Sequence, residues 1–214
     1  MKVTNAPATR VLARAAILFA ALSALCLLLA GCGRAGAAQI PASAKVALSE
    51  APLLDQAGRR VRLAQDVIGE RIAVVNFIYT SCTTVCPVSS ATFQQLQQRL
   101  AASLGKEVVL VSITVDPLRD TPQRLREYGA RYRAAEGWTW LTGAKPDVDG
   151  ALKGFGAYTP NFEDHPAMVL VGDARAGKWT RFFGFPSVDD LAARIEAIQA
   201  AREAGKVAHH HGKE

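Results

Sequence analysis

The sequence predicts an α/β domain in which helices flank a central mixed sheet. Residues 72–79 and 108–115 are near-continuous apolar runs rich in β-branched residues, which is typical of strands buried on both faces. Apolar residues at helical spacing follow the first run. The chain has 214 residues, of which 50% are hydrophobic and 7% aromatic. This size and composition fit one globular domain with an appendage and exclude collagen-like, disordered and multi-span membrane proteins.

The charge of the chain argues against a nucleic-acid partner. The sequence has 25 Lys and Arg against 19 Asp and Glu, a formal net charge of +6. Lys2, Arg10 and Arg14 lie in the first 31 residues, which contain no acid, so the remainder has 22 basic residues against 19 acidic ones. A charge of +3 spread over a whole domain is too weak to indicate nucleic-acid binding.

Residues 1–31 have the layout of a secretory signal, because basic residues precede the apolar run Ala15–Ala30 and small residues close it. The run has 16 residues, fewer than the ~20 of a comfortable transmembrane span. Its end, Leu29-Ala30-Gly31-Cys32, resembles the lipobox of bacterial lipoproteins, which implies that Cys32 is lipidated and becomes the new N-terminus. The alternative is an uncleaved signal anchor with Cys32 as an incidental thiol. Cys26, inside the run, is interpreted as an apolar filler.

Three regions follow the signal. Residues 32–44 are predicted to be a flexible tether, since Gly33–Ser43 is mainly Gly, Ala, Ser and Pro. No repeat or second linker divides residues 45–205, so we expect a single domain there. Residues 206–214 form a histidine-containing tail, and its His209–His211 run is expected to be idle, with weak metal binding as the alternative.

The first half of the domain is predicted to alternate strands and helices. Leu53-Leu54 and Val61–Leu63 flank the turn-rich Asp55–Gly58, which indicates an N-terminal β-hairpin. After the strand at 72–79, a helix is expected to run to Gly105. Its apolar face has spacings of three and four residues and consists of Phe93, Leu96, Leu100 and Leu104. The strand at 108–115 comes next.

The second half continues with a helix that Thr121 caps and Pro122 begins. A short strand at 138–141 and a short helix at 147–155 form an insertion, whose aromatic residues Trp138, Trp140 and Phe155 are assigned to the core. Two strands, 168–171 and 179–183, are joined by a turn, and Ser187 caps a last amphipathic helix. The order of hairpin, β, α, β, α, insertion, ββ and α predicts a thioredoxin-like fold.

Cys82 and Cys86 are the two cysteines of the domain, and they lie where the first buried strand turns into its helix. Residues four apart on a helical turn have Cβ atoms ~5 to 6 Å apart, and a disulfide needs ~3.5 to 4.5 Å, so a modest adjustment lets this pair open and close. Unpaired N–H groups at a helix start favour a thiolate. The alternative is a plain structural disulfide, although so short a loop gains little stability from a bridge.

His165 is the only histidine before the tail. A lone histidine is more often a surface residue or a satisfied core residue than a ligand. However, His165 lies just before the strand at 168–171, and in a thioredoxin-like sheet the loop entering that strand faces the cysteine turn. Two soft thiolates and one imidazole suit copper, whereas structural zinc normally needs a fourth ligand.

Three blocks of the sequence resemble the Sco/SenC family of copper chaperones. The blocks are Phe77–Pro87 with both cysteines, Thr114–Pro122, and Asp164-His165 before an apolar strand, and they occur in the family's order. With the hairpin they cover residues 50–200. The resemblance implies a membrane-tethered periplasmic protein that delivers copper to the binuclear copper centre of cytochrome c oxidase or to another periplasmic copper protein. It carries copper ligation onto Cys82, Cys86 and His165, and a reversible disulfide onto the two cysteines.

The chain departs from the family at two places. Thr83-Thr84 stands where members commonly have Pro-Asp, and Pro166 follows His165 where many have a small residue. Thioredoxin-like proteins place a cis-proline at the start of the strand facing the cysteines, so we expect a cis His165-Pro166 bond, with a trans bond as the commoner alternative. The block around Asp116 and Asp120 is interpreted as mainly structural, since it also makes an ordinary helix entry.

Two functions remain in competition. The first is a copper chaperone, and the second is a thiol-disulfide reductase that keeps a target's copper-binding cysteines reduced. Three residues separate Cys82 from Cys86, whereas general oxidoreductases of this fold usually have two. A peroxidase of the peroxiredoxin kind is excluded, because Tyr79 stands where such enzymes place a proline.

Overall fold

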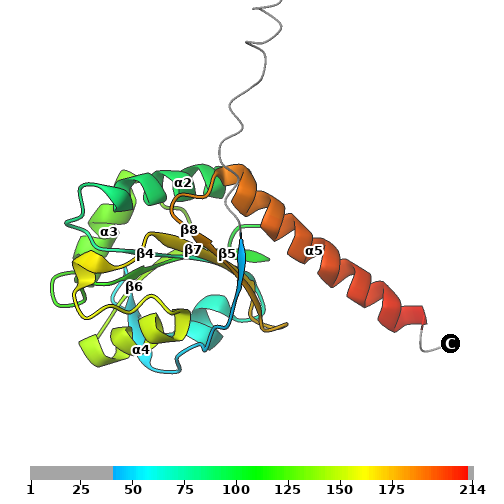
Figure 1. Cartoon of the computed structure of the whole chain (residues 1–214), viewed down its shortest axis with the longest axis horizontal. Coiled ribbons are helices and arrows are strands. Elements are labelled where there is room, and N and C mark those ends of the chain that lie inside the picture. The colour runs from blue at the N-terminus through cyan, green and yellow to red at the C-terminus, as the bar shows by residue number, and fades with distance from the viewer. Residues whose placement is uncertain (1–40, 212–214) are drawn as a thin grey trace, which may run out of the picture. The chain divides into compact units, whose positions relative to one another are not determined.

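A computed structural model describes residues 41–211, with side chains over residues 41–206 (Figure 1). Eight strands form one mixed sheet in the order β1-β8-β7-β4-β5-β6-β2-β3. The elements in chain order are β1 (Ala42–Ala44), β2 (Pro52–Asp55), β3 (Arg60–Arg62), the π-helical turn η1 (Leu63–Ile68), β4 (Ile72–Ile78), α2 (Val85–Arg99), β5 (Val108–Thr114), α3 (Pro122–Arg131), β6 (Trp138–Thr142), α4 (Lys145–Phe155), the 3-10 turn η2 (Phe162–Asp164), β7 (Met168–Asp173), β8 (Lys178–Phe183) and α5 (Val188–His211).

Helices cover both faces of the sheet, and α2 and α4 lie on opposite sides of it (Figure 1). β4 is buried along its whole length, parallel to β5 on one side and antiparallel to β7 on the other. One face packs against α2, α3 and α5, through residues that include Phe93, Leu125 and Leu191. The other packs against η1 and α4. The predicted thioredoxin-like arrangement of a mixed sheet between helices is therefore confirmed.

The predicted helix starts have the expected caps. The Thr121 hydroxyl accepts a hydrogen bond from the Arg124 backbone N–H at 3.3 Å, and Pro122 is the first residue of α3. Ser187 caps α5 by accepting from the Asp190 N–H at 3.1 Å, while the Asp190 carboxylate accepts from the Ser187 N–H at 2.9 Å. Each bond satisfies a donor that the helix itself leaves free.

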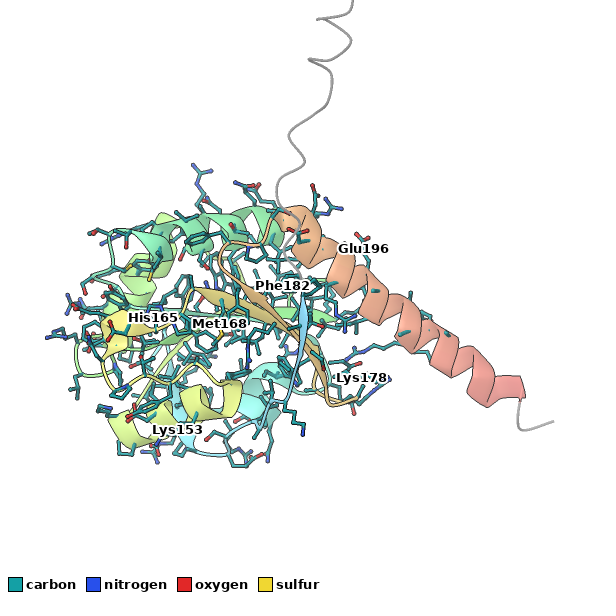
Figure 2. All side chains as sticks on the ribbon, viewed as in Figure 1. Lys153, His165, Met168, Lys178, Phe182 and Glu196 are labelled. Carbon is teal, nitrogen blue, oxygen red and sulfur yellow. The ribbon has the colours of Figure 1, made fainter. Side chains whose placement is uncertain are left out.

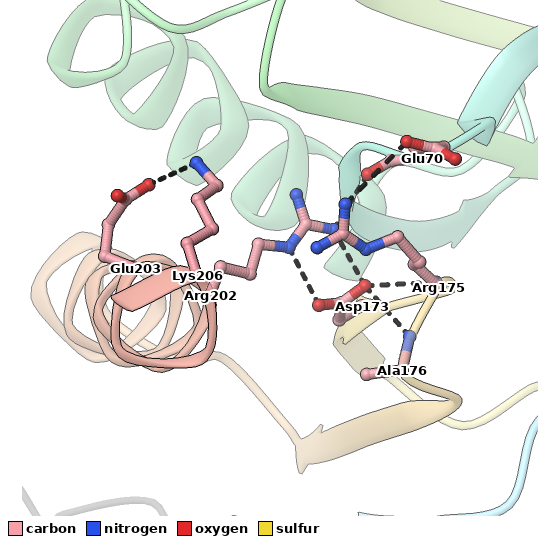
Figure 3. Close-up of polar contacts among 7 residues, drawn as sticks. All are labelled: Glu70, Asp173, Arg175, Ala176, Arg202, Glu203 and Lys206. Atoms are coloured by element: carbon pink, nitrogen blue, oxygen red, sulfur yellow. Dashed lines mark hydrogen bonds and ion pairs between the residues drawn. The ribbon is translucent and has the colours of Figure 1, made fainter. Parts of the chain in front are cut away.

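The C-terminal helix is fastened to the β7–β8 turn by a largely buried ion pair (Figure 3). Arg202 donates to both oxygens of the Asp173 carboxylate, at 2.7 and 2.8 Å, and to the Glu70 carbonyl at 2.8 Å. The hydrogen bonds from Arg202 hold the pKa of Asp173 below its ordinary value, against the effect of burial. A bidentate pair of this kind fixes both distance and orientation, so it holds α5 against the end of β7.

The helix predicted to run to Gly105 ends earlier. α2 stops at Arg99, and the chain then forms turns up to Glu107. Leu104 leaves the helix and makes an isolated parallel bridge with Val108. Its side chain still packs against the same cluster as Phe93. Apolar periodicity therefore identified the buried face correctly but not the end of the helix.

Two further boundaries differ from the prediction. Residues 42–44, assigned to the tether, form β1, which pairs antiparallel with β8. The pairing uses backbone groups of an Ala-Ser-Ala segment, whose small side chains give no strand pattern. Residues 206–211, assigned to a tail, continue α5 to His211. The predicted signal, Cys26, Cys32 and the tether up to residue 40 lie outside the described residues. Within residues 41–211 no helix has the length and apolarity to cross a membrane.

The predicted hairpin is confirmed, since β2 pairs with β3. It also joins the sheet, because Leu54 and Asp55 of β2 pair with β6. Trp138, Trp140 and Phe155 are each 1% exposed or less, as their assignment to the core requires. The insertion thus adds a third parallel strand to the sheet and a covering helix to one face.

Candidate metal and redox site

The two cysteines lie at the carboxyl end of β4, where the chain turns into α2. Both are free thiols, with Cys82 6% exposed and Cys86 1% exposed. Cys86 belongs to the first turn of α2, and its backbone N–H donates to the Cys82 sulfur at 3.4 Å. The structure therefore places the Cys82 sulfur at the helix start, as predicted, where an unpaired N–H is available to it.

The surroundings of the two thiols give them opposite acidities. Burial alone would raise the pKa of Cys82, but hydrogen bonds from the Cys86 thiol, the backbone N–H groups of Cys86 and Thr84, and the Tyr79 hydroxyl lower it to about 7, below its ordinary value. Burial and the neighbouring Cys82 raise the pKa of Cys86. Near neutral pH the pair therefore consists of a readily formed thiolate at Cys82 and a protonated thiol at Cys86.

His165 follows η2 and lies just before β7, with 8% of its surface exposed. Its Nδ1 lies 2.8 Å from the Phe162 carbonyl oxygen. Because a carbonyl can only accept, the neutral ring carries its proton on Nδ1 and leaves the Nε2 lone pair free. Histidines that bind metals are commonly held in this way, with the second ring nitrogen donating to a carbonyl. The orientation of the His165 ring thus fits metal binding through Nε2.

Tyr79 lies in the cysteine loop, residues 79–84, which joins β4 to α2, and it links this loop to His165. Burial raises the pKa of Tyr79 to about 12, so its hydroxyl keeps its proton near neutral pH and helps to lower the pKa of Cys82. Its ring meets the His165 ring edge to face, with centroids 5.7 Å apart. His165 lies at the opposite end of the domain from Lys178, the first residue of β8 (Figure 2). The histidine and the cysteine loop therefore share one end of the sheet, with Tyr79 between them.

The three predicted ligands are not assembled at metal-binding distance. Among the residues that the structure describes, no three His, Cys, Asp or Glu side chains are grouped so that they could hold one ion. Cys82 and Cys86 are neighbours, and the Tyr79 ring, which meets the His165 ring, belongs to the loop that carries Cys82. The ligand set therefore stays a prediction that requires His165 or the cysteine loop to shift.

The expected cis bond before Pro166 was wrong, because no peptide bond in the described part of the chain is cis. His165 has φ −62° and ψ 135°, an extended backbone. This is the conformation that proline imposes on the residue before it.

Asp120 is a further residue of the site, and the sequence did not show which residues it contacts. It is 1% exposed, and its carboxylate accepts from the Thr80 backbone N–H at 3.0 Å, from the Thr80 hydroxyl and from the Thr114 hydroxyl at 2.6 Å. Asp120 thereby fastens the cysteine loop to the β5–α3 connection. The position of this acid after a strand neighbouring β4 was the available signal, since carboxyl ends of parallel strands meet at one edge.

Comparisons with known proteins identify the family of the chain. The SCO1/SenC family model matches residues 43–199. The chain belongs to the SCO1/SenC family. Among its relatives, the SCO1 protein homolog of Bacillus subtilis is 32% identical over 118 residues, and Protein SenC of Rhodobacter capsulatus is 31% identical over 121 residues. These matches cover 54% and 53% of this chain, and 60% and 53% of the relatives, so the chain spans little more than half of their length.

Solved structures of Sco proteins share the fold. BsSco, described as a Sco-family cytochrome c oxidase assembly protein with a disulfide switch, has a TM-score of 0.60 and 25% identity over 74% of this chain and 96% of that one. ScoI of Bradyrhizobium japonicum, solved with copper bound, has a TM-score of 0.57 and 23% identity over 75% of this chain and 99% of that one. The SCO1/SenC chain thus has the architecture of its structural relatives.

Proposed function

We propose that this SCO1/SenC protein is a copper chaperone held on the periplasmic side of a bacterial membrane by a lipid on Cys32. In this proposal it delivers copper to the binuclear copper centre of cytochrome c oxidase or to another periplasmic copper protein. The observation that supports it most is the combination of two free thiols with a histidine that presents Nε2. No other cysteine and no other histidine is present in residues 41–206.

The proposed site suits copper as cargo. Cys82 supplies a thiolate near neutral pH, Cys86 a second sulfur, and His165 a nitrogen. Cu(I) is drawn by soft sulfur ligands, whereas Cu(II) also needs the imidazole. A site with two sulfurs and one nitrogen can accept either ion, which is useful to a protein that takes up an ion and passes it on.

Anaerobic titration of the reduced protein with Cu(I) tests the chaperone function. We expect one ion per chain, and loss of tight binding in Cys82→Ser and in Cys86→Ser. Replacement of His209–His211 by Ala is the matched control, because it removes the other histidines of the chain, and this variant should bind like the parent protein. Tight binding that survives the loss of Cys82 and Cys86 would exclude this pair as the copper site.

The acidity difference between the two thiols favours a second candidate function, a thiol-disulfide reductase. A low-pKa thiolate attacks a disulfide readily, and the protonated neighbour can then resolve the mixed disulfide. The metal-free, reduced protein would reduce a disulfide between the copper-binding cysteines of its target and become oxidised at Cys82 and Cys86. His165→Ala separates the functions, because it should impair Cu(II) binding and leave disulfide reduction intact.

A further inference from the structure

The turn between β5 and α3, residues 116–120, touches both loops that carry the proposed ligands. On one side Asp120 holds Thr80 of the cysteine loop. On the other side the Arg119 guanidinium lies over the ring of Phe162, 5.4 Å from its centroid. Phe162 belongs to η2, three residues before His165. One short turn is therefore in contact both with the cysteine loop and with η2, which directly precedes His165.

Arg119 is held in place by a buried acceptor. Its Nη1 donates to the Asp116 carboxylate at 2.9 Å, and the side chain of Asp116 is only 4% exposed while that of Arg119 is 61% exposed. An ion pair with so exposed a partner contributes little to stability. Its effect is geometric, because it keeps the flat guanidinium against the Phe162 ring, where a cation is attracted to the aromatic face.

Phe162 passes this contact on to the histidine. Its ring meets the Tyr79 ring edge to face, with the ring centroids 5.1 Å apart. Tyr79 in turn meets the His165 ring, with a centroid distance of 5.7 Å. Its backbone carbonyl is the acceptor for His165 Nδ1. A displacement of Phe162 would therefore move the one group that holds the proton on Nδ1 and leaves Nε2 free.

We propose that Arg119 is a positioning residue, which acts through Phe162 to hold His165 with Nδ1 protonated and Nε2 presented as the ligand atom. The proposal rests on the proposed function in one respect, namely that His165 binds copper. It goes further by giving Arg119 a separate effect on the two oxidation states. Cu(II), which needs the nitrogen, depends on Arg119, and Cu(I), held by the two sulfurs, does not.

The first test needs no copper. Ring ¹⁵N NMR of the reduced, metal-free protein reports the tautomer of His165, recorded with His209–His211 replaced by Ala so that one histidine remains. At about pH 8, the parent protein should show the Nδ1-protonated tautomer that the Phe162 carbonyl favours. Arg119→Gln and Phe162→Leu should each give a mixture of tautomers. Arg131→Gln is the matched control, because it removes a guanidinium that lies 5.7 Å from the ring centroid of Tyr128 rather than over Phe162.

The second test measures copper affinity in the same variants. Arg119→Gln should weaken Cu(II) binding by about tenfold, the lower end of the effect of groups that orient metal ligands, and leave Cu(I) binding within about twofold. Because both residues act through one contact, Arg119→Gln combined with Phe162→Leu should weaken Cu(II) binding no more than Phe162→Leu alone. Phe162→Tyr, which keeps the ring, should restore the parent behaviour.

Three results would overturn the positioning role: the parent tautomer in Arg119→Gln, unchanged Cu(II) affinity in that variant, or an equal loss of Cu(I) and Cu(II) binding. A failure of the proposed function looks different. If His165→Ala bound Cu(II) as well as the parent, His165 would not be a ligand, and the proposed effect of Arg119 on Cu(II) would fall with it. The tautomer measurement would still decide whether Arg119 positions the ring.

Discussion

Cys82 and Cys86 are chemically unequal although they are four residues apart in one loop and helix turn. Cys82 receives hydrogen bonds from several donors, whereas Cys86 is more deeply buried and donates to its neighbour. The first thiol is therefore suited to begin an exchange with a partner, as a thiolate attacking a disulfide or as the first sulfur to meet a copper ion. The second is suited to complete it.

The inequality predicts a single low titration. As the pH rises through about 7, ultraviolet absorbance of the reduced protein should show one thiolate forming, because Cys82 is protonated below that value and ionised above it. Cys82→Ser should remove this step. A first thiolate that forms only near the ordinary cysteine pKa of ~8.5 would contradict the assigned environment.

The sequence identified Cys82, Cys86 and His165 by residue type, since few side chains other than thiols and imidazoles bind copper or exchange disulfides. It did not identify Tyr79 or Asp120 as parts of the site. Tyrosines and aspartates are common, and the roles of these two depend on contacts formed only in the fold. Asp120, for example, meets Thr80 across 40 positions of the chain.

At the scale of elements, the connections around β4 and β5 determine the geometry of the site. Strand runs and helix caps could be predicted because they follow from local composition, as at β4 and at Thr121. The start of the domain at β1 and the end of α2 could not, since backbone pairing and turns replaced a side-chain pattern there. The distance between the cysteine loop and His165 could not be predicted either, because no local sequence pattern encodes it.

Removing the Asp120 anchor should loosen the cysteine loop. Asp120→Ala leaves the Thr80 N–H and two hydroxyls without their buried acceptor, at a cost of about 2 to 4 kcal/mol in the free energy of unfolding. Urea unfolding measures this loss. Asp189→Ala is the control, because it removes an ion pair whose aspartate side chain is 86% exposed, which should cost less than about 1 kcal/mol. Equal losses in the two variants would refute the anchoring role.

Two glycines test the packing of β7 and α5. A Cβ added to Gly172 would overlap the ring of Trp179, so Gly172→Ala should lower the free energy of unfolding by about 1 to 3 kcal/mol.

Gly205 is the contrasting position, because it lies in α5 with open space around it. Gly205→Ala should raise the free energy of unfolding by up to about 1 kcal/mol through better helix propensity. Calorimetry on the parent and both variants would show whether the shifts have opposite sign.

For the whole molecule, the redox state of the pair should control copper binding. A disulfide between Cys82 and Cys86 uses both sulfur ligands at once, so the oxidised protein should not bind Cu(I) tightly. Anaerobic titration of oxidised and reduced samples measures the difference, and reduction of the oxidised sample should restore one ion per chain. Equal affinity in the two states would show that the copper site lies elsewhere.

The location of the site in the cell depends on Cys32. If Cys32 carries the lipid, Cys32→Ser should release a soluble form or block processing at Gly31, because a single lipidated residue anchors the exported domain. Fractionation of cells and the N-terminal mass of the mature protein measure both outcomes. Cys26→Ser serves as the control, since Cys26 lies in the part of the signal that processing removes. A different outcome would identify the segment as an uncleaved anchor. In that case Cys32→Ser stays in the membrane, and the masses show that both the parent protein and the variant keep the signal. That result would move the domain's attachment from Cys32 to the apolar run while leaving the cysteine and histidine site unchanged.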